Sequence, residues 1–399
     1  MSTDATTKPQ QGPPLSAGEI LQNAQALATK IHEADLASEY DKLRKLPTDI
    51  VEQVRATGVM RMNMPGIWGG PEMSAMEQVE VIEALSRADA SVGWCSFIWC
   101  DSGIYSGYLD DAVGRSMYPR LDMATSGWVY PVGQAHRVEG GYRLSGQWMF
   151  GSGCNHCDWL AAGCIVYRDG ETELDPSGKP LWRILMAQPE EYEIQDTWYT
   201  TGLRGTGSND YRCEDLFVPE EHSFSFQEPA KRTGTIWAKP DHLLRKMAGV
   251  PLGVAADAID YAKLALSDKL DRRTGVLYRD MPKVQYAIAE AHSILGGARS
   301  YVFSSLEAQW RRLEVGQPLT EEERANAWLS RTNAFQAGRQ VVSLIYDTIG
   351  GNAIYARKSP LDRHLRDINT ACQHMVAQTR NMEGVGSLLL GGEPSNSMM

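Results

Sequence analysis

The sequence lacks the features that mark membrane, nucleic-acid-binding and disulfide-rich secreted proteins. Its longest apolar stretches, such as SVGWCSFIWC and MAGVPLGVAA, are far shorter than the ~20 residues that cross a bilayer, so no membrane span is expected. No cluster of basic residues offsets the net charge of -11, which argues against a nucleic-acid partner. The polar start has no signal-peptide pattern and the seven cysteines form no dense framework, so we expect a reduced, cytoplasmic protein.

Three candidate metal ligands, Cys154, His156 and Cys157, crowd into the segment GSGCNHCDW. A zinc site needs about four ligands, but the chain contains no second Cys-x-x-Cys and no His-x-x-x-His. A redox dithiol would open a helix after a strand, whereas the following DWLAAGCIVY has the pattern of another strand. We therefore expect no metal site, and a loop between strands in which the cysteines pack.

The pattern of apolar residues divides the chain into a helical, a β and a second helical part. Residues 1–14 are rich in Pro, Gln and Thr and are expected to form a disordered tail. Over 15–120 the apolar residues recur every three or four positions; Ser16 and Glu19 resemble a capping box, and two helices are expected to meet near Asp89.

Short apolar runs separated by Gly, Asp and Pro predict an antiparallel, barrel-like β-domain over 121–230. Residues 231–399 are helical again and suit an antiparallel bundle. The predicted fold class is therefore α+β, with a central β-domain between two helical domains.

Motifs in this order resemble the acyl-CoA dehydrogenase superfamily. They are GYRLSGQWMFGSG, GLRGTGSNDYRCEDLFVPEEH at 202–222, and the C-terminal pair AIDYAKLALSDKLDRRTGVLYRDMPKVQYAIAEA and YDTIGGNAIYARKSPLDRHLRDI. The resemblance covers residues 16–386 and implies an acyl-CoA dehydrogenase-like fold whose C-terminal part is a four-helix bundle.

One departure from the dehydrogenase pattern decides the expected reaction. After Leu-x-Arg-Asp the dehydrogenases carry Tyr-Glu-Gly, and that Glu removes a proton from the thioester. Here the equivalent residues are His374, Met375 and Val376, and a methionine cannot abstract a proton. A histidine at this point resembles the reduced-flavin-dependent monooxygenase branch, which includes p-hydroxyphenylacetate hydroxylase oxygenase components, secosteroid hydroxylases and indole-acetate monooxygenases.

The resemblance implies the oxygenase component of a two-component flavin monooxygenase. Such an enzyme takes reduced FMN or FAD from a separate flavin reductase, forms a C4a-hydroperoxyflavin with O₂ and hydroxylates an electron-rich small aromatic molecule, phenolic or indolic. The Gly205–Gly207 segment lacks the third glycine and the βαβ unit of a nicotinamide fingerprint, which agrees with a separate reductase. The resemblance also implies a homo-oligomer, expected to be a tetramer.

Two other functions remain open. An acyl-CoA dehydrogenase or oxidase would need a carboxylate base displaced onto another helix, and Glu383 is the candidate, although its spacing from Arg-Asp is wrong. An N-oxygenase would share the fold and the cofactor but act on an amine.

The resemblance also assigns roles to individual residues. Ser152 resembles the serine near flavin N5, and His374 the histidine that faces the peroxide or the substrate; the alternatives are a turn serine and a core histidine. One helical face, by residue spacing, comprises Trp94, Ile98, Asp101 and Tyr105. The resemblance implies that this face lines the substrate cavity. Asp101 is either the substrate anchor or the cap of a helix break.

The residues expected to contact the flavin are Thr125, Ser126, Trp128, Trp148, Phe150, Ser152, Arg204, Thr206, Arg272, Arg273, Gly350 and Gly351. Trp148 resembles the tryptophan that flanks the ring system, with a plain core aromatic as the alternative. Arg272 and Arg273 resemble the arginine that reaches the flavin phosphate of a neighbouring subunit, with solvated helix-end charges as the alternative.

Overall fold

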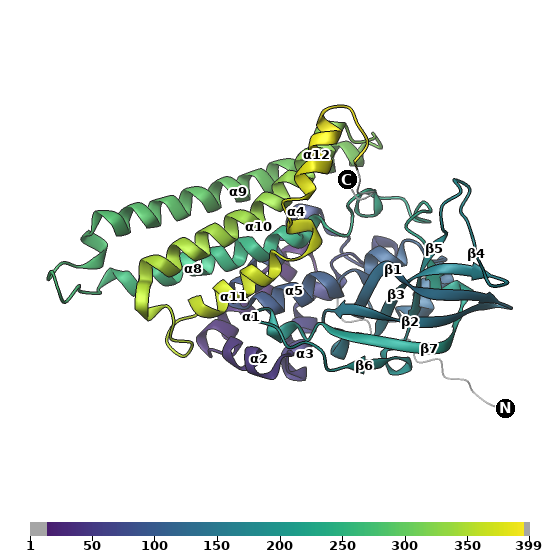
Figure 1. Ribbon diagram of the computed structural model, residues 1–399, viewed down its shortest axis with the longest axis horizontal. Helices are drawn as coiled ribbons and strands as arrows, with labels where there is room; N and C mark the ends of the chain where they lie inside the picture. The colour runs from purple at the N-terminus through teal and green to yellow at the C-terminus, as the bar shows by residue number, and fades with distance from the viewer. Residues whose placement is uncertain (1–13, 395–399) are drawn as a thin grey trace.

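The structure of the chain, a computed structural model, describes residues 14–394 (Figure 1). The expected disordered tail therefore lies outside the described residues, apart from Pro14. In the described part of the chain, no helix is both long and apolar enough to cross a membrane.

The N-terminal helices are α1 (Ala17–Glu33), α2 (Ala37–Leu43), α3 (Thr48–Thr57), α4 (Ala75–Ala88), α5 (Ala90–Trp99), α6 (Ser102–Ser106) and α7 (Asp111–Met117). Ser16 and Glu19 form the predicted capping box at the start of α1. Asp89 ends α4, and its carboxylate accepts hydrogen bonds from the N–H groups of Ser91 and Val92 at the start of α5. The predicted division near Asp89 is therefore confirmed.

The central region is one eight-stranded sheet with the order β6-β7-β2-β1-β3-β5-β8, and β4 pairs with β3. The strands are β1 (Thr125–Val138), β2 (Gly141–Gly151), β3 (Trp159–Arg168), β4 (Glu171–Thr172), β5 (Trp182–Ala187), β6 (Glu193–Gln195), β7 (Asn209–Pro219) and β8 (Ser223–Phe224).

The sheet is mixed, so the prediction of an antiparallel β-domain is wrong at one pairing. β1 and β3 run parallel, with Thr125 opposite Trp159 and His136 opposite Tyr167. β2 forms a hairpin with β1, and the turn over 152–158 then brings the chain back beside the first residues of β1. β3 must therefore run in the direction of β1. Alternation of side chains determines which face each residue occupies, but it carries no information about strand direction.

The C-terminal helices are α8 (Gly249–Ser267), α9 (Pro282–Glu314), α10 (Glu321–Ile349), α11 (Leu361–Ala371) and α12 (Asn381–Leu389). Figure 1 shows α8, α9 and α10 side by side at the end of the molecule opposite the sheet, with α11 along α10. The predicted fold, helices followed by a sheet and a C-terminal bundle, is confirmed. α4 packs along α8, which joins the two helical parts.

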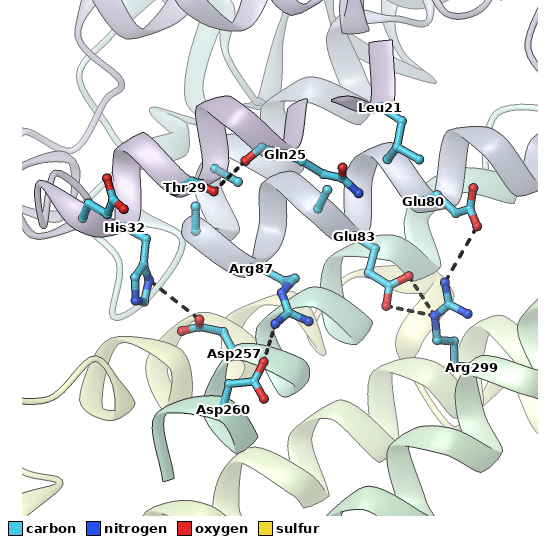
Figure 2. A pocket seen from close by; sticks show the side chains of 14 residues that line it. Leu21, Gln25, Thr29, His32, Glu80, Glu83, Arg87, Asp257, Asp260 and Arg299 are labelled. Atoms are coloured by element: carbon cyan, nitrogen blue, oxygen red, sulfur yellow. Dashed lines mark hydrogen bonds and ion pairs between the residues drawn. The ribbon is translucent and has the colours of Figure 1, made fainter. Parts of the chain in front are cut away.

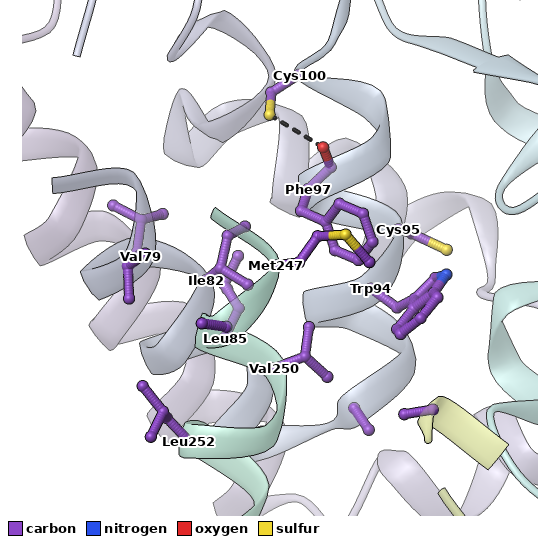
Figure 3. Close-up of a cluster of buried hydrophobic side chains, with 14 of the residues drawn as sticks. Val79, Ile82, Leu85, Trp94, Cys95, Phe97, Cys100, Met247, Val250 and Leu252 are labelled. Carbon is purple, nitrogen blue, oxygen red and sulfur yellow. Dashed lines mark hydrogen bonds between the residues drawn. The ribbon is translucent and has the colours of Figure 1, made fainter. Parts of the chain in front are cut away.

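A large apolar core fills the space between α4, α5 and α8 (Figure 3). Its buried side chains include Val79, Ile82, Leu85, Trp94, Phe97, Met247, Val250 and Leu252. A second cluster lies within the sheet. Burial of this much apolar surface holds α5 firmly against α8, because each buried aliphatic or aromatic side chain contributes roughly 1.5–3 kcal/mol. This packing fixes the position of Trp94, which lies on α5.

Candidate active site

Three of the predicted residues, Trp94, Ser152 and His374, lie together although they come from distant parts of the chain. The indole Nε1–H of Trp94 donates to Ser152 Oγ at 3.1 Å. The rings of Trp94 and His374 meet edge-on, with centroids 5.6 Å apart. Helix α5, the turn after β2 and the segment before the short helix η11 (Met375–Ala377) therefore form one candidate site.

His374 is an uncharged hydrogen-bond donor in this site. Burial alone lowers the pKa of its imidazole to about 4, while the residue as a whole is only partly buried. The backbone N–H of Val376 donates to Nδ1 at 3.4 Å. A neutral imidazole that accepts at Nδ1 carries its proton on Nε2, so His374 presents an Nε2–H donor at neutral pH.

No carboxylate joins this arrangement. Within residues 14–394, the hydrogen bonds and ring contacts of Trp94, Ser152 and His374 are made to hydroxyl, aromatic and backbone groups. Glu383, the candidate for a displaced base, lies exposed on α12. The site can donate and accept hydrogen bonds, but it presents no anionic base of the kind that removes a proton from a thioester.

Ser152 is the end of a buried row of hydroxyl groups. Its Oγ lies 2.7 Å from Ser208 Oγ, which lies 2.7 Å from Thr206 Oγ1. Thr206 Oγ1 donates to the carbonyl of Leu203 at 2.7 Å. The backbone N–H of Leu203 in turn donates to Asp367 at 2.6 Å. The loop between β6 and β7 is thus tied both to the site and to α11.

Backbone geometry brings the turn after β2 close to α5. Phe150 and Gly153 have φ values of 59° and 72°, in the left-handed region. A Cβ on Gly153 would lie 2.4 Å from the indole of Trp99, whose Nε1–H donates to the Gly153 carbonyl. Glycine is required here because any side chain would push the turn away from α5. Cys154, next in the turn, is buried in the core of the sheet, as predicted.

The predicted substrate face is interrupted, because α5 ends at Trp99 and α6 begins at Ser102. Ile98 is partly buried. Tyr105 packs against Phe224 at 5.3 Å between centroids rather than against Ser152 or His374. The structure therefore brings only Trp94 of the four residues into contact with the candidate catalytic pair.

Of the two alternatives for Asp101, side-chain capping of the helix break is not observed, although Asp101 occupies the N-cap position of α6. Its carboxylate makes no capping hydrogen bond to α6 and instead accepts from Lys246 Nζ at 2.5 Å. Both side chains are buried, and burial raises the pKa of Asp101 to about 6. A buried carboxylate needs a compensating cation more than a helix end needs a cap. Lys246 occupies Oδ1, so Oδ2 is the other acceptor atom of this carboxylate.

Two of the residues expected at the flavin, Trp148 and Thr125, have no accessible surface at all. Trp148 stacks on Tyr211 and donates to the Gly163 carbonyl, within the core of the sheet. Thr125 shares hydrogen bonds with the hydroxyls of Ser102 and Tyr118. A side chain without accessible surface has no atom that a cofactor can touch, so both predictions are wrong. Trp148 is a core aromatic.

Ser126 and Thr206 are almost fully buried and act on the site indirectly. Ser126 Oγ donates to the backbone carbonyl of Ser152 at 2.6 Å, which supports the turn. Arg204 is also committed to structure, since its guanidinium donates to the carbonyls of Asp41 and Thr200. It fastens the loop between β6 and β7 to α2.

Trp128 and Phe150 do present aromatic surface beside this turn. Their rings lie 5.6 Å apart, and 49% of Phe150 is exposed. Phe150 is two residues before Ser152, so the ring pair and the hydroxyl belong to the same short segment of the chain. An exposed pair of rings of this kind suits the face of a flat ring system.

Arg272 and Arg273 lie in the exposed turn between α8 and α9. Gly350 and Gly351 follow α10 at the same end of the bundle, where Lys269 Nζ donates to the carbonyl of Ile349. Figure 1 shows this end on the side away from the sheet. α8, which spans about 28 Å at 1.5 Å per residue, separates the turn that carries the two arginines from the segment around Lys246 at its other end.

Two residues with a clear role in the site region were not predicted. Lys246 follows Arg245 just before an apolar helix, and a lysine entering such a run is a signal for a buried ion pair. Asp367 belongs to the Leu-x-Arg-Asp motif, and burial and the nearby Asp89 raise its pKa to about 7. Nothing in the local sequence indicates that it holds the Leu203 backbone.

A surface groove lies away from these residues, between α1, α4, α8 and α9 (Figure 2). Several of its charged side chains pair with one another, such as Arg299 with Glu83 and Arg87 with Asp260. Because no predicted site residue lines it, we do not assign the activity to this groove.

Comparison with known proteins supports the assignment of this site. Residues 18–112 match the acyl-CoA dehydrogenase N-terminal domain family, and residues 246–379 match the acyl-CoA dehydrogenase C-terminal domain family. The chain belongs to the acyl-CoA dehydrogenase superfamily. Both helical parts that build the candidate site fall within the matched residues.

Individual relatives point to one branch of this superfamily. The chain is 29% identical over 373 residues to an indole-3-acetate monooxygenase of Acinetobacter baumannii, covering 93% of this chain and 94% of that protein. It is 25% identical to the oxygenase component of an FADH₂-dependent resorcinol hydroxylase of a Rhizobium species, over 90% of this chain and 91% of that one.

A solved structure, the 3-HSA hydroxylase of Rhodococcus sp. RHA1, superposes with a TM-score of 0.86 at 25% identity, covering 96% of this chain and 99% of that one. The predicted branch, reduced-flavin-dependent monooxygenases, is confirmed.

Proposed function

We propose that this protein is the oxygenase component of a two-component flavin monooxygenase that hydroxylates a small, electron-rich aromatic molecule. The observation that carries the proposal is the uncharged His374 beside Met375, which stands at the position where dehydrogenases of the superfamily keep a glutamate. A neutral donor beside two aromatic rings and a hydroxyl suits oxygen transfer. It does not suit removal of a proton from a thioester.

The residues of the site fit a flavin. Trp128 and Phe150 offer an apolar platform, and Ser152 offers a hydroxyl oxygen next to it. Reduced flavin, when bound there, supplies the electrons that activate O₂. His374 Nε2–H donates a hydrogen bond to the reacting oxygen or to the substrate. Trp94, which packs on Phe97 at 5.0 Å between centroids, covers one side of the imidazole and shields it from water.

A phenolic or indolic substrate is the proposed class. The relatives named for indole-3-acetate and resorcinol act on aromatic compounds, and electrophilic oxygen prefers electron-rich rings. Asp101 Oδ2 is the proposed acceptor for the substrate O–H or N–H, because Lys246 already balances its charge. An N-oxygenase would need a proton acceptor for its amine, and His374, with its low pKa, is a weak one.

The active form is proposed to be a homo-oligomer, with a tetramer as the expected state. Arg272 and Arg273 protrude at the end of the bundle away from the sheet, where they can reach the flavin phosphate of a neighbouring copy. The exposed apolar residues Leu264 and Leu270 lie beside this turn and would be covered by such a contact. A separate reductase is the proposed source of reduced flavin.

The proposal is tested by mixing the protein anaerobically with reduced FMN or FAD and a panel of phenols and indoles, then adding ¹⁸O₂. The expected result is one ¹⁸O atom in a hydroxylated product and oxidised flavin released. Omission of the substrate should give hydrogen peroxide instead. Failure of every aromatic compound to gain ¹⁸O, with oxidation of an acyl-CoA thioester by tightly bound flavin, would assign the chain to the dehydrogenases.

A further inference from the structure

The hydroxyl row that ends at Ser152 has chemically defined ends. At one end stands the Nε1–H of Trp94, a group that only donates, 3.1 Å from Ser152 Oγ. At the other end stands the carbonyl of Leu203, a group that only accepts, 2.7 Å from Thr206 Oγ1. Ser152, Ser208 and Thr206 lie between them and are each at least nine-tenths buried.

These two ends determine the direction of every bond in the row. Each hydroxyl has a single proton to donate. The proton of Thr206 lies toward the carbonyl, so Thr206 can only accept from Ser208. The proton of Ser208 is then committed, so Ser208 can only accept from Ser152. Trp94 donates to Ser152 from the opposite side.

It follows that Ser152 has no proton left to donate. Its Oγ donates to Ser208, accepts from Trp94 and retains one free lone pair. A buried hydroxyl that would ordinarily turn toward either a donor or an acceptor is held as an acceptor only. The Leu203 carbonyl also accepts from Trp198 Nε1–H and from the backbone N–H of Thr206. To reverse the row, Thr206 would have to turn its proton away and leave two oxygen lone pairs in contact at 2.7 Å.

We propose that this polarised row makes the site selective for reduced over oxidised flavin, with Ser208 and Thr206 as positioning residues that act through Ser152. The inference rests on the proposed function. N5 of reduced flavin carries a hydrogen and donates, whereas N5 of oxidised flavin has only a lone pair. The lone pair of Ser152 therefore attracts the first and repels the second.

Such selectivity suits an enzyme that takes reduced flavin from solution and must release the oxidised form. Because one hydrogen bond is replaced by a contact between two lone pairs, the dissociation constants of the two forms should differ by at least about tenfold through Ser152 alone. Trp94 contributes as the fixed donor that closes the row.

The test measures the dissociation constants of oxidised and reduced FMN and FAD, under anaerobic conditions, in the full-length protein and its variants. Ser208→Ala frees the proton of Ser152, which can then donate to oxidised N5. Thr206→Val frees the proton of Ser208, and that proton can turn toward Ser152 with the same result. Both variants should reduce the preference for reduced flavin about tenfold, mainly through tighter binding of the oxidised form.

Two control variants separate the row from general packing. Thr206→Ser keeps the hydroxyl and should restore the preference of the unaltered protein. Ser330→Ala removes one hydroxyl from a matched buried pair, Ser305 and Ser330, which lie 2.7 Å apart between α9 and α10. It should leave the preference unchanged.

An unchanged preference in both Ser208→Ala and Thr206→Val, with reduced flavin still bound, would overturn the inference. Equal affinity of the unaltered protein for both flavin forms would also overturn it, and that measurement needs no variant to fold. No binding of reduced flavin to the unaltered protein would instead overturn the proposed function.

Discussion

Trp94 and His374 meet edge-on at 5.6 Å between ring centroids, with their planes inclined by 70°. The same indole donates its Nε1–H to Ser152, so one side chain of α5 connects the turn after β2 with the segment after α11. An edge-on contact of this kind adds roughly 0.5–1.5 kcal/mol to the burial of the two rings. Its main consequence is positional, since it fixes the imidazole relative to the hydroxyl.

Trp94→Phe should uncouple the reaction while leaving the fold intact. Phenylalanine keeps an aromatic ring against His374 but removes the donor to Ser152. We expect hydroxylated product per O₂ consumed to fall about tenfold, with a matching rise in hydrogen peroxide. Trp159→Phe is a close control, because Trp159 is buried, donates to a backbone carbonyl and meets His222 edge-on at 5.4 Å. Comparable coupling losses in both variants would contradict a specific role for Trp94.

His374→Ala should remove the donor from the reaction centre. We expect the rate of hydroxylation to fall about a hundredfold, within the range for one acid–base group, and the affinity for reduced flavin to change little. Product formation and flavin binding are measured separately on the same preparation. His222→Ala serves as the control for loss of a half-buried histidine. Unchanged turnover in His374→Ala removes this residue from the mechanism.

The depressed pKa of His374 predicts a pH dependence of stability with a defined sign. The imidazole titrates near 6.5 in the unfolded chain and at about 4 in the folded protein. Between these two pH values the unfolded state binds more protons than the folded state. The free energy of unfolding is therefore unaffected by this group above pH 6.5 and falls as the pH is lowered toward 4. Against His374→Gln, the free energy of unfolding of the unaltered protein should therefore decline over this window. The free energy of unfolding of both proteins is measured with urea at pH 4.5 and pH 7.5. An equal difference between the two proteins at both pH values would contradict the assigned pKa.

Local patterns predicted the parts of this fold that depend on neighbouring residues. The Ser16–Glu19 capping box and the division of α4 from α5 at Asp89 involve contacts within three residues, so spacing alone identifies them. The parallel pairing of β1 with β3 depends on how a later turn returns the chain, which side-chain alternation does not encode. Helix–sheet–helix order was predictable; strand direction was not.

Some residues of the candidate site could likewise be predicted from local motifs, whereas others could not. His374 and Ser152 were found because each stands within a recognisable motif, although their contact through Trp94 joins three distant segments. Trp148 stands in the same motif but points into the core of the sheet, whereas Phe150, two residues later, is exposed, because a β-bulge between Trp148 and Gly151 interrupts the alternation of faces. The Asp101–Lys246 pair could not be predicted, because it depends on how the end of α5 docks beside the segment that precedes α8.

That buried pair gives the last prediction, in which a single and a double variant separate stability from substrate binding. Lys246→Met leaves the Asp101 carboxylate buried without its cation and should cost about 3–5 kcal/mol at pH 8. Lowering the pH to 5 should recover part of this loss, because burial already raises the pKa of Asp101 to about 6 and the protonated acid carries no charge.

The double variant Asp101→Asn/Lys246→Met has no buried charge at this position and should regain most of the stability at pH 8. If Asp101 also anchors the substrate, KM for a phenol or indole should still be about tenfold higher in this variant with kcat nearly unchanged. If KM and kcat of the double variant instead equal those of the unaltered protein, Asp101 has a role in the fold alone, because only stability would then depend on the pair.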